Sequence, residues 1–215
     1  MSAALAVPPG ASAASLADLI GGVIPYVDSS DGTVRFDSFQ YIPTVGAPNA
    51  ADVNIVPDAS VPQGFLVQGT FSVTGIPGFG VGLNALLGYK ATVLSGGPFS
   101  KAQLYLDPVD VTVAGSAGSL GSSAFIAEKV DSLTSTSVTT LTVAQSAAEP
   151  PVPSDVEALA GYGHSLGVLT NIGLTAMPET TSHAEVREFA VNFVPEPATG
   201  VLLLGLCGVA ALRRR

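Results

Sequence analysis

The chain has 215 residues, of which 47% are hydrophobic and 12% charged, and its formal net charge is −9 at pH 7. Three of its eight basic residues end the chain, so seventeen acidic residues accompany only five basic ones elsewhere. Because nucleic acid is bound through clustered Lys and Arg, this distribution excludes nucleic acid as a partner. Few charges and abundant Gly, Pro, Ser and Thr are typical of a secreted all-β domain.

The first thirteen residues contain the cleavage end of a signal peptide. Helix breakers at Pro8-Pro9-Gly10 precede an Ala-x-Ala site at Ala11-Ser12-Ala13. A basic region and a long apolar core are missing, so we interpret residues 1–13 as a signal-peptide remnant, with a disordered N-terminus as the alternative. A short helical segment is expected directly afterwards, within residues 14–20.

Alternation of apolar and polar residues recurs along the body of the chain. Phe65, Val67, Phe71 and Val73, for example, share one face of a predicted strand. The predicted strands are residues 23–28, 34–42, 52–56, 65–74, 89–94, 102–106, 109–114, 123–130, 137–144, 164–175 and 186–193. Aromatic residues are expected on both faces of the strand predicted at residues 34–42. Short strands separated by frequent turns predict a single antiparallel β-sandwich, jelly-roll or immunoglobulin-like, over residues 14–193.

Turn residues separate these strands. Asp31-Gly32 predicts a hairpin, Ser95-Gly96-Gly97-Pro98 a break, and residues 78–82 a flexible glycine-rich loop. The strongest internal break is residues 149–154, which could divide two domains. We read it as a long loop, because the residues after it offer too few strands for a core of their own. A helical turn is expected at residues 155–159.

The C-terminal tail, residues 194–215, has three consecutive parts. Val194, Pro195, Glu196 and Pro197 predict an extended and accessible backbone, because each proline fixes φ and lacks an N–H. The uncharged residues 198–212 predict a transmembrane helix of roughly 22 Å, short against the ~30 Å hydrocarbon core. The terminal arginines predict that the C-terminus is cytoplasmic and that the body lies on the outer side. These orienting residues are Arg213, Arg214 and Arg215.

This tripartite tail resembles the PEP-CTERM sorting signal of biofilm-forming Gram-negative bacteria. The resemblance implies transit through the inner membrane, recognition at Pro195-Glu196-Pro197 by an exosortase, cleavage, and release to the cell surface or extracellular matrix. It also implies an association with exopolysaccharide, and no activity for the body. A buried core helix with a basic cap and a tail anchor that is never processed are the alternatives.

The body offers little catalytic chemistry. His164 and Ser165 are neighbours, so their side chains point to opposite faces of a strand, and no Gly-x-Ser-x-Gly elbow frames a serine. The acidic residues, which fall mostly in predicted loops, nominate no glycosidase pair. We therefore predict that the protein is not an enzyme and has no cofactor.

Metal and sugar sites are also weakly indicated. Asp28-Ser29-Ser30-Asp31-Gly32 and the pair Asp107 and Asp110 are better explained as turns than as calcium sites, since EF-hand spacing is missing. Two distant histidines, His164 and His183, make a poor zinc site, so no metal is predicted. The chain has no Trp and five Tyr, which favours buried aromatics over a sugar platform. A polysaccharide- or calcium-binding module that stays membrane-anchored remains the alternative function.

Overall fold

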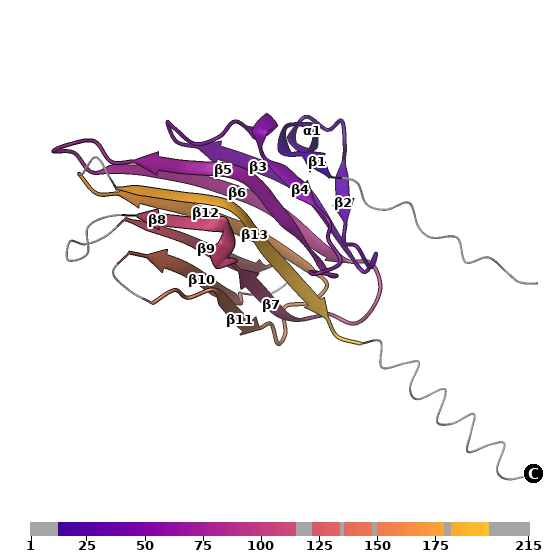
Figure 1. Cartoon of the computed structure of the whole chain (residues 1–215). Coiled ribbons are helices and arrows are strands. Elements are labelled where there is room, and N and C mark those ends of the chain that lie inside the picture. The colour runs from indigo at the N-terminus through magenta and orange to yellow at the C-terminus, as the bar shows by residue number, and fades with distance from the viewer. Residues whose placement is uncertain (1–12, 115–121, 134–135, 148–149, 179–181, 198–215) are drawn as a thin grey trace, which may run out of the picture.

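The computed structural model describes residues 13–114, 122–133, 136–147, 150–178 and 182–197. Within them the strands form two antiparallel sheets that face each other (Figure 1). Along the first sheet the strands are β1 (Ala14–Ser15), β4 (Asn54–Val56), β5 (Gly64–Thr74), β13 (His183–Pro195), β7 (Phe99–Tyr105) and β11 (Ser154–Ala158), and β8 (Val111–Ala114) also pairs with β13. Along the second they are β10 (Val138–Ser146), β9 (Ser123–Ser132), β12 (Ser165–Ala176), β6 (Val81–Val93), β3 (Val34–Pro43) and β2 (Tyr26–Asp28). The prediction of an all-β, sandwich-like fold is confirmed.

In the described part of the chain, three short helices accompany the sheets. They are α1 (Leu16–Ile20) and the 3₁₀ turns η1 (Ala50–Asp52) and η2 (Pro108–Asp110). The predicted helical segment near the N-terminus is α1, and Ser15 caps it by accepting a hydrogen bond from the Asp18 backbone N–H at 3.1 Å. Leu16 and Leu19 are buried, so α1 adds its apolar side to the core.

The core lies between the sheets and is rich in phenylalanine. The predicted inner face of β5 is confirmed, with Phe65, Val67 and Phe71 all buried. Phe65 meets Phe36 edge to face at 4.8 Å and Tyr89 at 5.2 Å between ring centroids. Aromatic pairs of this geometry stabilise a fold by about 0.5–1.5 kcal/mol beyond the burial of their surface. These ring contacts join β5 of the first sheet to β3 and β6 of the second, and so help to hold the two sheets together.

Strand β3 departs from the predicted alternation. Its aromatic residues were expected on both faces, yet Phe36 and Phe39 are both buried. The reason is a β-bulge: the register with β6 shifts between Asp37 and Gln40, and Ser38 has a φ of 59°. The extra residue changes the parity of the strand, so both phenyl rings point into the core.

Two further predictions are wrong. Strand β6 begins at Val81 rather than at residue 89, so the end of the expected flexible loop is the start of a central strand. Residues 155–159 do not form a helical turn, because Ser154–Ala158 is strand β11 and pairs with β7. The edge of β7 offers backbone hydrogen-bond partners to an extended segment, and all five residues of β11 pair with it.

Residues on both sides of the break at 149–154 contribute to the same sheets. After it come β12, which lies between β9 and β6, and β13, which lies between β5 and β7. The predicted hairpin at Asp31-Gly32 is present as the antiparallel pair β2 and β3. Among the residues that the structure describes, no helix is long and apolar enough to cross a membrane. The expected transmembrane segment, residues 198–212, lies outside them, as do residues 1–12 of the expected signal-peptide remnant.

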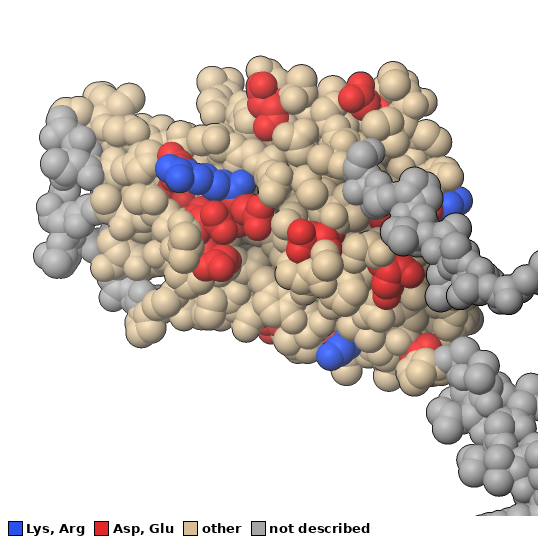
Figure 2. All heavy atoms as spheres, turned by 45° about the vertical axis from the view of Figure 1, so that its right-hand side comes forward, with Lys and Arg blue, Asp and Glu red and all other residues tan. Residues whose placement is uncertain are grey.

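The surface charge is mainly acidic, as the excess of Asp and Glu in the composition predicts. On the face drawn in Figure 2, acidic side chains are spread over the surface and basic ones are few. Three of the Lys and Arg side chains in the described residues pair locally: Arg35 with Asp28, Lys129 with Asp131, and Arg187 with Glu185. A surface of this kind repels the phosphates of nucleic acid.

Candidate functional site

The end of strand β13 carries the predicted processing residues. Val194 pairs with Lys101 and Pro195 with Phe99, so the strand runs two residues past the expected end of the sandwich at 193. The Val194 carbonyl also accepts a hydrogen bond from the Ser100 hydroxyl at 2.9 Å. The extended conformation that the sequence predicts is therefore present at this position.

The predicted accessibility is present only in part, because residues 196 and 197 are exposed but the backbone of Glu196 is hydrogen-bonded. The Glu196 N–H donates to the Pro98 carbonyl at 2.7 Å, and the Glu196 carbonyl accepts from the Gly97 N–H at 2.7 Å. Pro195 is buried, while Glu196 and Pro197 are exposed. We call Gly96, Gly97, Pro98 and Ser100 the motif seat, since these residues contact Val194, Pro195 and Glu196.

The local sequence explains why the seat forms. Gly96 has a φ of +113°, a conformation that other residues rarely adopt, and it lies close to the Glu196 carbonyl. A Cβ atom at Gly97 would lie 2.8 Å from the Cβ of Glu196. Pro195, which has no N–H to donate, stands where the register between β13 and β7 shifts. The two glycines therefore let the β6–β7 connection approach the tail backbone.

The tail also borders a hollow of about 510 Å³. Its walls are Thr33, Gln63, Ser95, Gly96 and Val194 to Pro197. Just upstream, Asn192 is bonded on both sides of β13: its Oδ1 accepts from the Gln63 N–H, and its Nδ2 donates to Gln103. The tail is thus anchored up to Phe193, whose N–H donates to the Gln63 carbonyl at 3.3 Å, and beyond it is held mainly by the motif seat.

The turn between β2 and β3 behaves as the sequence predicts. One carboxylate oxygen of Asp31 accepts from the Ser29 hydroxyl at 2.8 Å and from the Thr33 N–H at 2.9 Å. Asp28 forms a two-point ion pair with Arg35, at 2.8 and 3.0 Å. These contacts are those of an Asx turn at Asp31 and of a cross-strand ion pair at Asp28.

The remaining predicted candidates also make local contacts. Asp107 caps η2 by accepting from the Val109 N–H at 2.9 Å. His183 lies 3.2 Å from the Thr74 hydroxyl and 3.5 Å from Glu185. Over the part of the chain that the structure describes, no three His, Cys, Asp or Glu side chains gather where they could hold a metal ion. Arg213, Arg214 and Arg215 lie outside the described residues.

A buried carboxyl group was missed by the sequence analysis. Glu128 on β9 is fully buried, and one of its oxygens accepts from the Tyr89 hydroxyl at 3.0 Å and the Thr170 hydroxyl at 3.1 Å. Its other oxygen has no hydrogen-bond partner. Burial raises the pKa of Glu128 to about 7, although both hydrogen bonds lower it. The signal was present in the sequence, because Glu128 shares the inward face of its strand with Ile126 and Val130.

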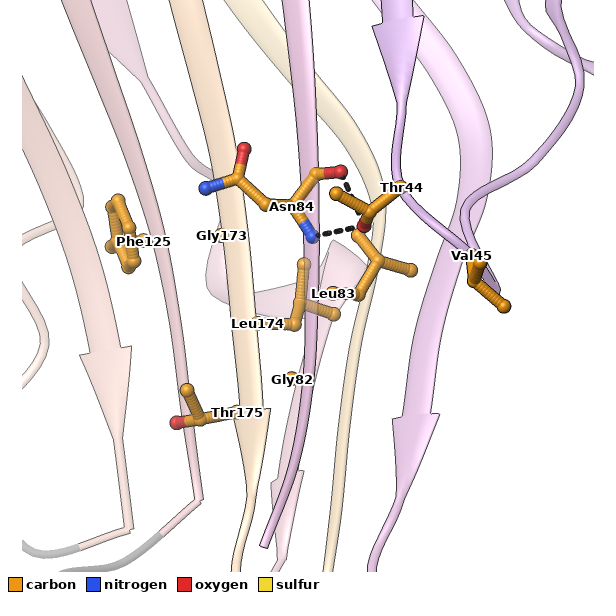
Figure 3. A pocket seen from close by; sticks show the side chains of 9 residues that line it. All are labelled: Thr44, Val45, Gly82, Leu83, Asn84, Phe125, Gly173, Leu174 and Thr175. Carbon is orange, nitrogen blue, oxygen red and sulfur yellow. Dashed lines mark hydrogen bonds between the residues drawn. The ribbon is translucent and has the colours of Figure 1, made fainter.

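The outer face of the second sheet has a second hollow, of about 500 Å³. Figure 3 shows the Phe125 ring on one side of Gly173 and the Asn84 side chain on the other. A Cβ atom at Gly173 would lie 2.2 Å from the Phe125 ring, so only glycine leaves room for it. Thr44 fixes the far wall through hydrogen bonds of 2.7 and 2.9 Å with the Asn84 backbone. The face therefore offers an aromatic ring beside amide and hydroxyl groups.

Residues 193–215 match the family model of the PEP-CTERM protein-sorting motif. The match begins at Phe193, inside strand β13, and covers the whole predicted tail. The chain is thus an all-β, sandwich-like protein that carries a PEP-CTERM sorting motif. This motif implies transit through the membrane, sorting by an exosortase, and export.

Comparison with curated proteins gives no match. Among solved structures, TmCBM61 in complex with β-1,4-galactotriose is 8% identical, with a TM-score of 0.34 over 73% of this chain and 89% of the other. The xylan-binding module CBM15 is 10% identical, with a TM-score of 0.25 over 73% and 98%. Endoglucanase 3 of Trichoderma harzianum, from family GH12, is 7% identical, with a TM-score of 0.25 over 73% and 98%. Likeness at these TM-scores assigns no function to this chain.

Proposed function

We propose that this chain is an exported, non-enzymatic protein of the cell surface or extracellular matrix of a Gram-negative bacterium, sorted and cleaved by an exosortase. The observation that carries the proposal is the sorting motif at residues 193–215, which continues the last strand of the sandwich without a linker. A tail joined in this way holds the body at the membrane until processing releases it. The acidic, lysine-poor body suits a protein that is soluble outside the cell. The association with exopolysaccharide rests on the sorting motif alone.

The parts of the chain have distinct roles in this proposal. Residues 1–13 carry the cleavage end of an export signal, residues 14–193 form the exported sandwich, and residues 194–215 are the sorting signal. Val194, Pro195, Glu196 and Pro197 are recognised by the exosortase. The segment 198–212 resides transiently in the inner membrane, and the arginines at 213–215 keep its end in the cytoplasm.

The first test measures processing of the full-length protein, expressed with an export signal in hosts with and without the exosortase. Only the host with the enzyme is expected to give a protein that lacks the tail by intact mass and occurs in the medium or matrix. Glu196→Ala is expected to slow this processing by at least about tenfold, as loss of a recognised charged group does. Glu157→Ala, which removes a carboxylate from edge strand β11, should be processed normally. A full-length protein held in the membrane of both hosts would overturn the proposal.

The terminal arginines give a separate prediction, which concerns the orientation of the chain in the membrane. Replacing Arg213, Arg214 and Arg215 together by glutamate is expected to disturb the topology, because clustered positive charge holds its end of a transmembrane helix in the cytoplasm. The topology is measured by protease protection in spheroplasts, which reports whether the body is accessible from outside. A body that stays as accessible from outside as in the wild type would contradict the assigned role.

A second candidate function is polysaccharide binding on the outer face of the second sheet. It is favoured by the hollow in which Phe125 lies over Gly173 beside Asn84 (Figure 3), because sugar rings stack on aromatic faces and bond to amides. Phe125→Ala is expected to abolish retention on a column of the producing strain's matrix polysaccharide. Phe79→Ala, an equally large truncation on an exposed loop, is the control and should leave retention unchanged. Equal retention of wild type and Phe125→Ala would exclude this face.

A further inference from the structure

The backbone of the sorting motif is engaged by the folded body. Both hydrogen-bonding groups of Glu196 are taken, its N–H by Pro98 and its carbonyl by Gly97, each at 2.7 Å. The Val194 carbonyl is held by the Ser100 hydroxyl at 2.9 Å. Pro195, between them, is buried and contributes no N–H. The tripeptide thus presents its side chains at positions 196 and 197, but little free backbone.

An enzyme that binds a peptide in an extended form needs that backbone. Main-chain hydrogen bonds supply much of the affinity in such complexes, and side-chain pockets supply the specificity. A buried Pro195 cannot enter a partner's pocket while it fills a position in the sandwich. The seated motif and the enzyme-bound motif are therefore different states of the same segment.

We propose that the motif seat is a gate on processing, and that Val194 to Pro197 must leave it before the exosortase can bind. This proposal rests on the proposed function. Gly97 is then a residue that controls access to the motif, although it lies about a hundred positions away in sequence and touches no reacting atom.

The geometry allows release without unfolding of the sandwich. Upstream, Phe193 is fully buried and Asn192 is bonded to Gln63 and Gln103, so the strand is fixed up to that point. Beyond it the tail is bonded to the motif seat and borders the hollow walled by Thr33 and Gln63. Opening of a strand end that involves few contacts is a low-energy local event.

Substitution of Gly97 is expected to disrupt the motif seat while leaving the rest of the fold intact. Gly97→Val places side-chain atoms where Glu196 lies, since even the first of them would be 2.8 Å from the Glu196 Cβ. The matched control is Gly80→Val, because a Cβ at Gly80 has no neighbour nearer than 3.9 Å and its φ is not positive. Ser100→Ala is a milder second variant, which removes only the bond to the Val194 carbonyl.

The first readout needs no enzyme. Amide hydrogen exchange of the purified full-length protein in detergent is measured at Glu196 and at residue 97. Wild type and Gly80→Val should both show protected Glu196 amides, and Gly97→Val should exchange there at least about tenfold faster. Far-UV circular dichroism checks that each variant is folded. A wild-type Glu196 amide that exchanges as fast as an unstructured peptide would overturn the seat itself.

The second readout is processing of the folded protein. Full-length protein in detergent is added to membranes that contain the exosortase, and loss of the tail is followed over time. Gly97→Val is expected to be cleaved several-fold faster than wild type, with Ser100→Ala between them and Gly80→Val equal to wild type. Equal or slower cleavage of Gly97→Val, with its Glu196 amide exposed, would overturn the gate but leave the proposed function intact. Cleavage of none of the proteins would overturn both, whereas a protected Glu196 amide would still show that the seat exists.

Discussion

Replacing Glu128 by glutamine is expected to remove most of the loss of stability that the protein suffers as the pH rises from 4.5 to about 7. The carboxyl group is fully buried in the second sheet, with two hydroxyl donors on one oxygen and no partner on the other. Burial opposes its charged form, so its pKa is higher in the folded protein than in the unfolded chain.

The sign of the effect follows from proton binding. Between pH 4.5 and about 7 the folded protein keeps the proton on Glu128 while the unfolded chain loses it, so rising pH favours unfolding. The wild type should therefore lose about 3 kcal/mol of unfolding free energy across this window through this group. Glutamine keeps the shape and the acceptor for Tyr89 but carries no charge at any pH.

Urea unfolding at pH 5, 6, 7 and 8 measures this difference in the full-length protein. The wild type should become less stable relative to Glu128→Gln as the pH rises, and the difference should level off above about pH 8. Glu157→Gln, on the edge strand β11, should follow the wild type. Parallel curves for wild type and Glu128→Gln would contradict a buried, neutral Glu128.

Truncation of Phe193 should have an effect of similar size. Its ring is fully buried, and its centroid lies 6.0 Å from that of Phe99 and 6.3 Å from those of Phe36 and Tyr89. Phe193→Ala is expected to destabilise the fold by about 3–5 kcal/mol, through lost burial and the cavity that remains.

The same unfolding experiment checks this value. Phe79→Ala is the matched control, because that ring is 71% exposed, and it should change stability by less than about 0.5 kcal/mol. A loss below about 1 kcal/mol for Phe193→Ala would mean that the last strand is not part of the core. Since Phe193 is also the first residue of the sorting motif, its truncation is expected to expose the Glu196 amide as well.

Local sequence patterns predicted much of the fold. Alternation identified the inner face of β5, and Asp31-Gly32 identified the hairpin between β2 and β3, because both signals involve residues close in sequence. The bulge at Ser38 was not predicted, since nothing in the local alternation marks the residue that takes a positive φ. Strand β11 was missed for a similar reason: its structure depends on the edge of β7, fifty residues earlier.

The candidate site was predicted only in part. The residues of the sorting motif could be identified because their order along the chain is the signal. Their contact with Gly97 could not, because it joins residues that are far apart in sequence. Glu128 lies inside the predicted strand 123–130 and could have been found from its alternation, because it shares the face of Ile126 and Val130.

The position of the last two strands has a consequence for the order in which the chain can fold. β12 and β13 are the middle strands of their sheets, each with earlier strands on both sides. Until they arrive, β5 and β7 have nothing between them, and β9 and β6 are likewise unconnected. A chain whose N-terminal end emerges first can therefore assemble only separate fragments of each sheet. These fragments would expose apolar surface. Folding is completed only when β13, the strand next to the sorting motif, has emerged. The unfinished chain must therefore be kept from aggregating during the whole of its export.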